Sequence, residues 1–481
     1  AWMSLFRNYG QLLSHRNVEG RRAVLDILET GMRAGDPYDN VRKAVRIEHG
    51  QLVIGSEDFP LGPIGAVDPS RPRPFPPGPI RIDLDRLGHI YLTGGGKAAQ
   101  REARALEDVL GDLITAGHVN AKKGDTIVLR HADVTLAGHP EPDEDSVSGA
   151  QQIVDVMRRA RRGDIIFECE SGGGTALITL PAPGLTLHDI QEVTRVFYLE
   201  HGAPIEAANA VRTLLTTLRL KHSRHAGDAM LIQLSTAERA ADSLAMLPSP
   251  PGVADEYERA ILVLKEYGCW DEIPESVRQH LLKRDPAYGH LRAEEWYDKP
   301  HFRIRVMGPE YMIDAAERRA REMGLNCGVL AISLSNLESS MLGDALGQIA
   351  HEVERHGRPL PAPCALVFGG ECVVNTGPNP GLGGRNAEFV ASASIRIAGS
   401  QRIVVGSADS DGSDGPTPYA GGIVDGETYG RAVKKGMDVA EEIRKHNTAA
   451  LLSALGDSIE TGILNTNVQD LRVAYIAPPA S

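Results

Sequence analysis

The stretch Tyr91-Leu-Thr-Gly-Gly-Gly-Lys-Ala-Ala-Gln100 joins an apolar run to three glycines, a lysine and the start of a helical pattern. A strand at His89–Leu92 and a helix at Ala98–Ala116 are expected on its two sides. Parallel sheets are built from such strand–loop–helix units, and ligands bind at the loops that follow the strands. This stretch therefore indicates an α/β fold with a candidate site at its glycine loop.

The same alternation of short apolar runs and helical patterns continues along the chain, as βαβ units require. After the glycine loop it predicts a strand at Thr126–Leu129, a helix at Val147–Arg162 and a strand at Asp164–Cys169. A second α/β portion begins near Phe302 and contains further predicted elements, namely strands at Phe302–Met307, Cys364–Phe368, Arg402–Val405 and Val473–Ile476 and a helix at Tyr311–Met323.

Length and composition exclude several classes of protein. The 481 residues are enough for two or three domains. The net charge of -13 argues against a nucleic-acid partner, which needs a clustered basic face. Five cysteines are scattered without a CxxC pair, which favours reduced thiols in the cytoplasm. No apolar run is long enough to span a bilayer and none resembles a signal peptide, so no membrane partner is expected.

The first glycine loop allows several interpretations. A Walker A loop needs four residues between its glycines and a Ser or Thr after the lysine, whereas Ala98 follows here. The Rossmann pattern GxGxxG/A is formally met, but the acid that should follow is Asp133, which lies too far along the chain. Two readings remain open: a plain strand-to-helix turn, and a turn that presents Lys97 to an anion.

Other glycine clusters also follow predicted strands. Ser171-Gly-Gly-Gly-Thr175 suits phosphate or carboxylate oxygens held by backbone N–H groups, or is a tight turn. In Gly383-Gly-Arg385-Asn386 an arginine flanked by glycines can bind a carboxylate or phosphate in bidentate fashion, or is a surface arginine. A further cluster is Gly369-Gly-Glu371.

An acidic segment, Asp409-Ser-Asp-Gly-Ser-Asp-Gly-Pro-Thr417, follows another predicted strand. It is not a calcium loop, because the invariant glycine position of an EF-hand falls on Asp414 and no downstream Glu completes the loop. The segment is expected to bind Mg²⁺, to accept the proton of a substrate hydroxyl, or to cap a turn.

Taken in order, these segments resemble the glycerate 2-kinase family that carries a C-terminal MOFRL domain. The resemblance runs from about residue 17 to 476 and includes "GGGKAA", "AGHPEPDEDS", "SGGGTAL", "NAVR", "GGRNAEF", "DGSDGPT" and "TNVQDLR". It implies two α/β domains, residues 7–295 and 296–481, each with a largely parallel sheet flanked by helices, and an active-site cleft between them. It also implies transfer of a phosphoryl group from ATP, with Mg²⁺, to D-glycerate or a related small hydroxy or sugar acid, and leaves a homo-oligomer open.

The resemblance assigns roles to residues of this chain. Lys97 matches the family's active-site lysine and Arg385 its substrate-contacting arginine, while Asp411 falls in the acidic segment that activates the hydroxyl. No metal ligand is assigned. The remaining residues expected to bind substrate or phosphate are Gly95, Gly96, Ser171, Gly172, Gly173, Gly174, Thr175, Asn209, Arg212, Glu371, Asn386, Asp414 and Asn467.

Several family segments are altered in this chain. Segments 213–221, 234–241, 246–252, 308–314 and 462–467 depart from the family pattern, and Ala387 stands where glutamine is usual. These changes fall where the resemblance places nucleotide and Mg²⁺. The sequence therefore keeps two alternatives to an ATP-dependent kinase: a lyase, isomerase or hydrolase of the same fold, and a ligand-binding protein without activity.

Overall fold

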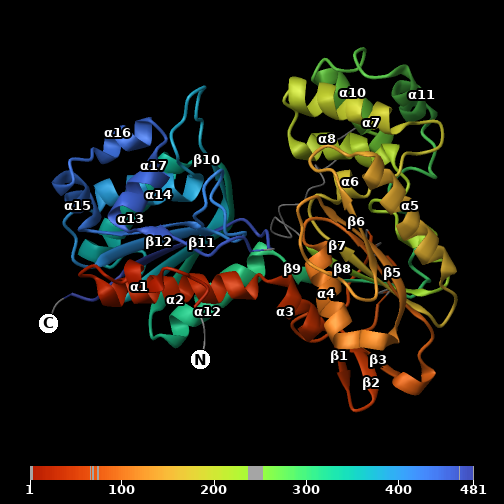
Figure 1. The fold of residues 1–481 in the computed structure, drawn as a ribbon, viewed down its shortest axis with the longest axis horizontal. Coiled ribbons are helices and arrows are strands. Elements are labelled where there is room, and N and C mark those ends of the chain that lie inside the picture. Colours follow the sequence, from red (N-terminus) through yellow and green to blue (C-terminus); the bar gives the residue numbers. More distant parts are fainter. Residues whose placement is uncertain are drawn as a thin grey trace. The chain divides into compact units, whose positions relative to one another are not determined.

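A computed structural model of the chain describes residues 4–65, 67, 70–72, 75–236, 253–464 and 466–479 (Figure 1). The altered segments at 237–241 and 246–252 lie outside them. Within the described part of the chain, no helix is long and apolar enough to cross a membrane. The fold divides into two compact units, and each is described here by itself.

One unit comprises Pro37–Thr236 and the described residues from 253 to Val306. It is built on a sheet whose strand order is β6-β5-β4-β7-β8-β9. The pairings from β6 to β8 are parallel, as predicted for this part of the chain. The strands are β4 (Ile90–Gly95), β5 (Ile114–Lys122), β6 (Asp133–Ala137), β7 (Ile165–Glu170), β8 (Met230–Thr236) and β9 (His301–Met307). The glycine loop after β4 therefore lies at the carboxyl edge of a central strand.

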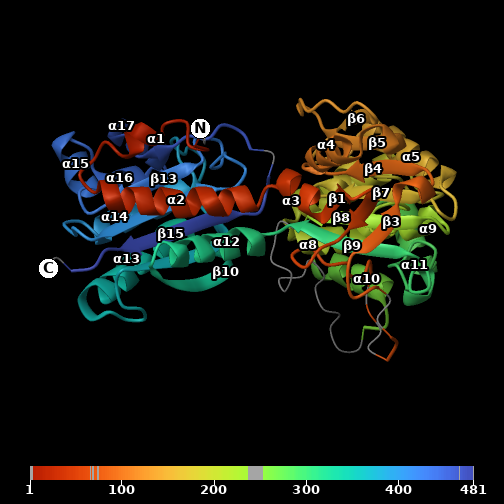
Figure 2. The same cartoon turned by 90° about the horizontal axis from the view of Figure 1, so that it is seen from below.

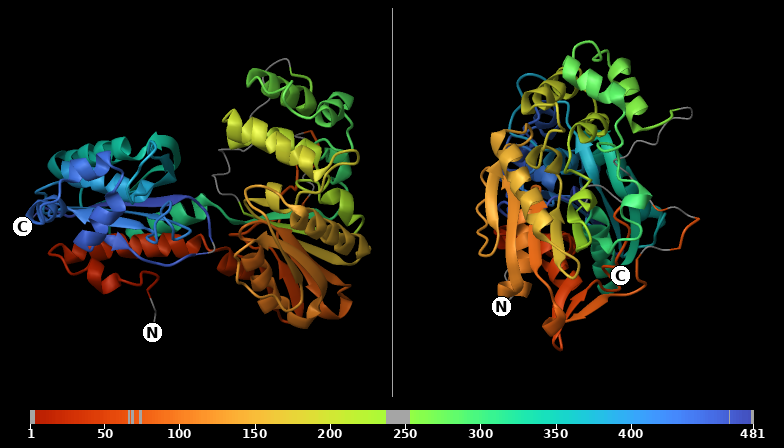
Figure 3. Two further views of the ribbon diagram at one scale, coloured as in Figure 1. Left: turned by 45° about the horizontal axis from the view of Figure 1, so that its top comes forward. Right: turned by 90° about the vertical axis from the view of Figure 1, so that its right-hand side faces the viewer.

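Helices cover both faces of this sheet, with α4 (Ala99–Leu110) and α5 (Glu144–Arg159) on opposite sides (Figure 1). A group of helices with its own apolar core gathers beyond one end of the strands (Figure 3). Its members include α7 (Leu187–Val193), α8 (Ile205–Arg212), α10 (Glu256–Glu266) and α11 (Glu275–Lys283). A small antiparallel sheet of β1 (Val45–Glu48), β2 (Gln51–Ile54) and β3 (Ile80–Asp83) completes the unit.

The other unit contains the chain up to Asp36 and the chain from Met307 onward, with a sheet of order β10-β11-β15-β12-β13-β14. Its strands are β10 (Asn326–Glu338), β11 (Cys364–Val373), β12 (Ile403–Asp409), β13 (Gly421–Asp425), β14 (Ser458–Ile459) and β15 (Asp470–Ile476). Among these described strands only β10 and β11 pair in parallel. This sheet is mixed rather than largely parallel, because β15 inserts antiparallel between β11 and β12.

Two layers of helices enclose the mixed sheet. Helices α2 (Val18–Ala34) and α12 (Pro309–Glu322) lie along one face, and α13 (Ser339–His356) and α14 (Arg385–Arg396) lie on the other (Figures 1 and 2). Helices α2 and α12 approach closely because Gly31 has no side chain; a Cβ there would lie 2.9 Å from the carbonyl oxygen of Met312. The division therefore differs from the predicted ranges 7–295 and 296–481, since α2 packs with the C-terminal sheet.

One predicted strand of the first unit is wrong. Residues Thr126–Leu129 form no strand; Val128 is 70% exposed, and the side chain of Gln100 binds the carbonyl oxygen of Ile127. The strand lies earlier, at Ile114–Lys122, in a region whose first residues were expected to continue α4. Helix α4 ends sooner because Gly111 adopts φ +51°, a left-handed conformation that favours glycine and stops a helix.

Candidate active site

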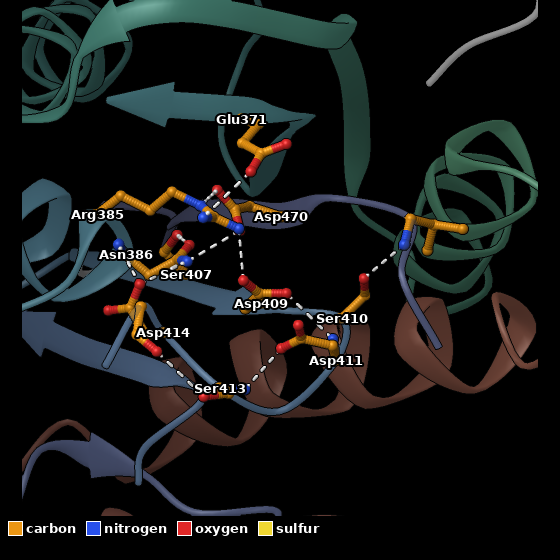
Figure 4. Close-up of polar contacts among 12 residues, drawn as sticks. Glu371, Arg385, Asn386, Ser407, Asp409, Ser410, Asp411, Ser413, Asp414 and Asp470 are labelled. Carbon is orange, nitrogen blue, oxygen red and sulfur yellow. Dashed lines mark hydrogen bonds and ion pairs between the residues drawn. The ribbon is translucent and has the colours of Figure 1, made fainter. Parts of the chain in front are cut away.

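Arg385 is the first residue of α14 and lies among three carboxylates (Figure 4). Its Nε donates to Asp470 Oδ2 at 2.8 Å, and its Nη2 donates to Asp409 Oδ2. Its Nη1 lies 3.3 Å from Glu371 Oε1. Two buried acids therefore hold the guanidinium on one side, and the other side faces Glu371, whose side chain is 49% exposed.

The two buried acids come from neighbouring antiparallel strands. Asp409 ends β12, Asp470 begins β15, and the two residues are direct partners across the ladder. Burial, together with the charge of Asp470, raises the pKa of Asp409 well above its usual range. Burial alone would lower the pKa of Arg385, but Asp470 and Asp409 raise it above its ordinary value, so the guanidinium stays charged.

Asp414 and Asn386 fix the start of α14. The carboxylate of Asp414 accepts hydrogen bonds from the backbone amides of Asn386 at 2.9 Å and Ala387 at 2.8 Å. The side-chain amide of Asn386 donates to Asp470 Oδ1 at 2.9 Å, and its oxygen accepts from Ser407. Burial raises the pKa of Asp414 to about 6. Asp414 thus has the capping role that was one of the readings of the acidic segment.

Asp411 lies next to this cluster and is partly buried (Figure 4). Its Oδ1 accepts from the backbone amide of Ser413 at 2.8 Å, and its own amide donates to Asp409 Oδ1 at 3.1 Å. Burial raises the pKa of the Asp411 carboxyl, which makes it a stronger proton acceptor once it is ionised. Asn467 lies in the same unit, three residues before β15.

Three members of the cluster, Asp409, Asp470 and Ser407, were not among the predicted site residues, although Asp409 is the first residue of the acidic segment. Asp470 stands in the quoted segment "TNVQDLR", directly before the apolar run that forms β15. A polar residue at the end of a buried strand is a usable signal, because strand ends line candidate sites. Ser407 offers no such signal, since it lies within the apolar run of β12.

Lys97 lies in the other unit, in the loop between β4 and α4. The glycine loop after β4 lies beside the loop after β7, because the two strands are parallel neighbours. The amide of Lys97 donates to the carbonyl oxygen of Gly172 at 2.8 Å, and the amide of Ala98 donates to Ser171 Oγ at 2.9 Å. Two glycine loops predicted separately thus form one paired structure at the carboxyl edge of the sheet.

Close packing explains why these loops are rich in glycine. Gly96 has φ +146°, and a Cβ there would lie 2.0 Å from Ser171 Oγ. Gly173 has φ +85°, and its Cβ would lie 3.2 Å from Lys97 Cγ. A Cβ on Gly95 would meet Ile178 at 2.1 Å, and one on Gly174, the residue before Thr175, would meet Arg219.

Four amides of these loops have acceptors within the protein. The amide of Gly96 donates to the carbonyl oxygen of Asn120 at 3.3 Å, and that of Gly174 donates to the carbonyl oxygen of Ser171 at 3.4 Å. These two amides and those of Lys97 and Ala98 are therefore engaged within the protein.

Asn209 and Arg212 lie one turn apart on α8. Arg212 is 4% exposed, and its Nε and Nη2 have no hydrogen-bond partner among the described residues. The same holds for Asn209 Oδ1 within the described part of the chain. Burial lowers the pKa of Arg212 to about 10. A buried guanidinium without a partner is costly, and an anionic ligand would remove that cost.

A pair of buried acids, one on β7 and one on α4, belongs to the same unit as the glycine loops. Glu168 of β7 is fully buried, and burial raises its pKa to about 7. Glu102 of α4 is also fully buried; burial, and then the charge of Glu168, raises its pKa well above the usual range. Carboxyl groups in such surroundings destabilise the fold when they are ionised.

Glu168→Gln is expected to change how stability depends on pH. The pKa of Glu168 is higher in the folded protein than in the unfolded chain, so the protonated carboxyl contributes to the free energy of unfolding. That contribution is complete below the pKa of the unfolded chain and is lost as pH rises through about 7. Between pH 5 and pH 8 the wild type should lose up to about 3 kcal/mol more unfolding free energy than the variant, measured in urea. Glu144→Gln, at an exposed position, is the control. Equal pH slopes for Glu168→Gln and wild type would contradict this role.

ATP and Mg²⁺ make different demands on a site: positive groups for the phosphate oxygens and oxygen ligands for the metal. Lys97 and the guanidinium of Arg212, whose Nε and Nη2 have no partner among the described residues, suit anionic oxygens. For the metal, no group of three or more His, Cys, Asp and Glu side chains in the described residues has an arrangement that could hold an ion. Asp409 and Asp470 bind Arg385 instead. The described side chains therefore offer no metal site of three or more such ligands.

Comparison with known proteins identifies relatives over most of the chain. The family model described as a domain of unknown function (DUF4147) matches residues 23–282, and the MOFRL family model matches residues 364–470. Glycerate 2-kinase of Pyrococcus horikoshii is 32% identical over 94% of this chain and 98% of its own length. D-glycerate 2-kinase of Thermotoga maritima is 34% identical over 82% of this chain and 92% of its own.

Two solved structures resemble the fold. A crystal structure of a Pyrococcus horikoshii protein has a TM-score of 0.75 at 29% identity, covering 95% of this chain and 99% of that one. The crystal structure of glycerate kinase from Thermotoga maritima also has a TM-score of 0.75, at 29% identity, covering 94% and 98%. The alternative of a lyase, isomerase or hydrolase finds no support among these relatives.

Proposed function

This chain belongs to the glycerate kinase family, and we propose on that premise that it phosphorylates the 2-hydroxyl of D-glycerate, or of a closely related hydroxy acid, with ATP. The observation that carries the proposal is the fixed guanidinium of Arg385. Its charge is held in place by Asp409 and Asp470, while Nη1 faces the exposed side chain of Glu371.

Arg385 binds the carboxylate of the hydroxy acid in this proposal. The pair of Nη1 and Glu371 is half exposed and 3.3 Å long, so it is weak, and a substrate carboxylate can replace Glu371 at little cost. The bonds from Nε and Nη2 to the buried acids remain, and they keep the guanidinium oriented during the exchange. A fixed donor loses less conformational freedom when it binds a ligand than a mobile one does.

Lys97 supplies positive charge at the phosphoryl group, and Asp411 orients the acceptor hydroxyl. Bound ATP would supply the phosphoryl group itself. Phosphoryl transfer depends mainly on positioning and on stabilising the negative charge of the phosphoryl oxygens. The loop around Lys97 suits this task because it is tightly packed. Gly96 lies against Ser171, and Gly173 lies against the side chain of Lys97. Asn209 and Arg212 are proposed as a further anion-binding pair.

A reducing cytoplasmic location is proposed together with this activity. The five cysteines, Cys169, Cys269, Cys327, Cys364 and Cys372, are all buried and free. Burial raises the pKa of each of these thiols, which keeps them protonated and slow to oxidise.

The proposal is tested by incubating the protein with ATP, Mg²⁺ and D-glycerate and measuring ADP release. Release that depends on D-glycerate, with a phosphoglycerate as the other product, is the expected result. Hydroxypyruvate and longer sugar acids serve as comparison substrates. ADP release that is the same with and without any acid, over the whole panel, would rule the proposal out.

Lys97→Ala is expected to lower kcat by about a hundredfold or more, since one charge-stabilising group is lost from the transition state. The amide of residue 97 keeps its bond to Gly172, so thermal stability should hardly change. Lys123→Ala is the matched control; that lysine is exposed on the same unit and pairs with Asp143 and Asp145. Unchanged kcat in Lys97→Ala would remove the lysine from the mechanism.

A further inference from the structure

A pocket of about 210 Å³ opens beside Arg385 and lies entirely within the unit that holds the mixed sheet. Its walls are mostly glycine and proline backbone with apolar side chains such as Val374. Arg385 brings a charged group and His446 an imidazole, and Cys372 and Thr376 also line the pocket. A mainly apolar pocket with a few convergent polar groups is the usual form of a small-molecule site.

A buried carboxylate holds His446 in place. His446 Nδ1 lies 2.9 Å from Glu388 Oε2, and Glu388 is 1% exposed on α14, one turn after Arg385. Burial raises the pKa of Glu388, while His446 opposes that rise. Among the described residues, the other ring nitrogen, Nε2, has no hydrogen-bond partner. With the Nδ1–H donated to Glu388, Nε2 of the neutral ring carries a lone pair and can accept a hydrogen bond.

Backbone and side-chain contacts fasten the segment of His446 to the glycine loop that precedes Arg385. The amide of Gly381 donates to the carbonyl oxygen of Lys445 at 2.9 Å, and the amide of Leu382 donates to Asn447 Oδ1 at 3.0 Å. A Cβ on Gly383 would lie 2.5 Å from the carbonyl oxygen of His446. Arg385 and His446 therefore belong to one tightly packed assembly.

We propose that this pocket is the acid-binding pocket of the enzyme and that His446 is a specificity-determining residue in it, accepting a hydrogen bond from a hydroxyl of the substrate. Arg385 binds the carboxylate and His446 Nε2 binds the 3-hydroxyl, so the pocket selects acids with a hydroxyl next to the reacting position. Glu388 is a positioning residue that fixes the ring tautomer. The identity of the acid rests on the proposed function, but the pocket itself does not.

The assignment follows from the difference between the two groups. A guanidinium donates and cannot accept, which suits a carboxylate. A neutral imidazole with Nδ1–H engaged accepts at Nε2, which suits an alcohol. A site that is built to bind a hydroxyl rejects analogues that lack it far more strongly than an apolar pocket rejects a missing methylene, because its polar group is left without a partner.

The test compares the binding of D-glycerate and D-lactate, which lacks the 3-hydroxyl, by calorimetry in the absence of nucleotide. Wild type should bind D-glycerate at least about tenfold more tightly. In His446→Asn that ratio should fall close to one; asparagine suits the backbone because φ is +50° at this position. His446→Gln should restore part of the ratio, and Glu388→Ala should lower it. His356→Asn, an exposed histidine in the same unit, should leave it unchanged.

The outcomes separate this inference from the proposed function. A ratio that His446→Asn leaves unchanged, in a protein with wild-type melting temperature, overturns the role of His446. Equal binding of the two acids by wild type, or binding of neither, overturns it as well. If the ratio responds as expected but no phosphoglycerate forms with ATP, the inference stands and the proposed function fails. A purely structural role for His446 would weaken both acids equally and would not move the ratio.

Discussion

Arg385→Ala is expected to abolish phosphoryl transfer and to lower the free energy of unfolding by about 3–5 kcal/mol. Without the guanidinium, the neighbouring acids Asp409 and Asp470, at 2% and 0% exposure, lose the cation that they share, and Asp470 keeps only Arg472 as a cationic partner. The substrate also loses its carboxylate partner, so kcat/KM should fall by roughly a thousandfold or more, as it does when a buried charged hydrogen bond is removed.

Urea unfolding and a steady-state assay measure the two effects of Arg385→Ala separately. Arg396→Ala is the matched control, because that arginine lies at the other end of α14 in an exposed pair with Asp344 and should contribute less than about 1 kcal/mol. The stability loss should be smaller at pH 5 than at pH 8, because the raised pKa of Asp409 lets that carboxyl protonate in mild acid. A stable Arg385→Ala protein with normal KM would contradict both roles.

Arg21→Ala is expected to destabilise the fold to a similar degree, by about 3–5 kcal/mol, without any direct effect on the site. Arg21 of α2 is completely buried, and its Nε donates to Asp425 Oδ2 at 2.7 Å. Its Nη1 donates to Asp457 Oδ1 at 2.9 Å and to the carbonyl oxygen of Leu12 at 3.1 Å. Removing it leaves two buried carboxylates with fewer partners and detaches α2 from β13.

The pH dependence of this network has the opposite sign to that of Glu168. Burial alone would raise the pKa of Asp457, but His15, Arg21 and Arg431 lower it below its usual value. Its contribution is therefore present above the unfolded pKa near 4 and is lost on acidification. Arg21→Ala should weaken that acid-dependent loss. Arg22→Ala, the exposed neighbour on α2, is the control for urea unfolding. A melting temperature equal to that of wild type would refute the structural role of Arg21.

Local patterns predicted the parts of the fold that depend on near neighbours in sequence. The stretch Tyr91–Gln100 forms a strand, a glycine loop and a helix as expected, because each step is encoded within ten residues. The strand β5 was missed because the stop of α4 depends on the left-handed Gly111, a weak signal in sequence. The insertion of β15 between β11 and β12 is set by packing between distant segments, so periodicity could not predict it.

The site divides in the same way. Arg385 and Asp414 were found because glycine-rich and acidic segments are visible in sequence. The contacts that define their roles join residues far apart in the chain: Arg385 binds Asp470, which lies 85 residues away, and Asp414 caps the helix that begins 29 residues before it. His446 was not predicted as a site residue, because a histidine before an asparagine in a polar loop carries no pattern. Its partner Glu388 and the packing of Gly383 distinguish it only in three dimensions.

The identity of the phosphorylated product is the strongest single test of the proposed reaction. Phosphorus NMR without proton decoupling, recorded after incubation with ATP, Mg²⁺ and D-glycerate, distinguishes the two phosphoglycerates by the number of protons on the phosphorylated carbon. A doublet is expected, because the proposed reaction places the phosphate on the 2-hydroxyl, whose carbon carries a single hydrogen. This doublet should be absent with Arg385→Ala. A triplet would mean phosphorylation of the 3-hydroxyl and would contradict the binding of that hydroxyl by His446; the absence of any new phosphoester signal would contradict the kinase activity itself.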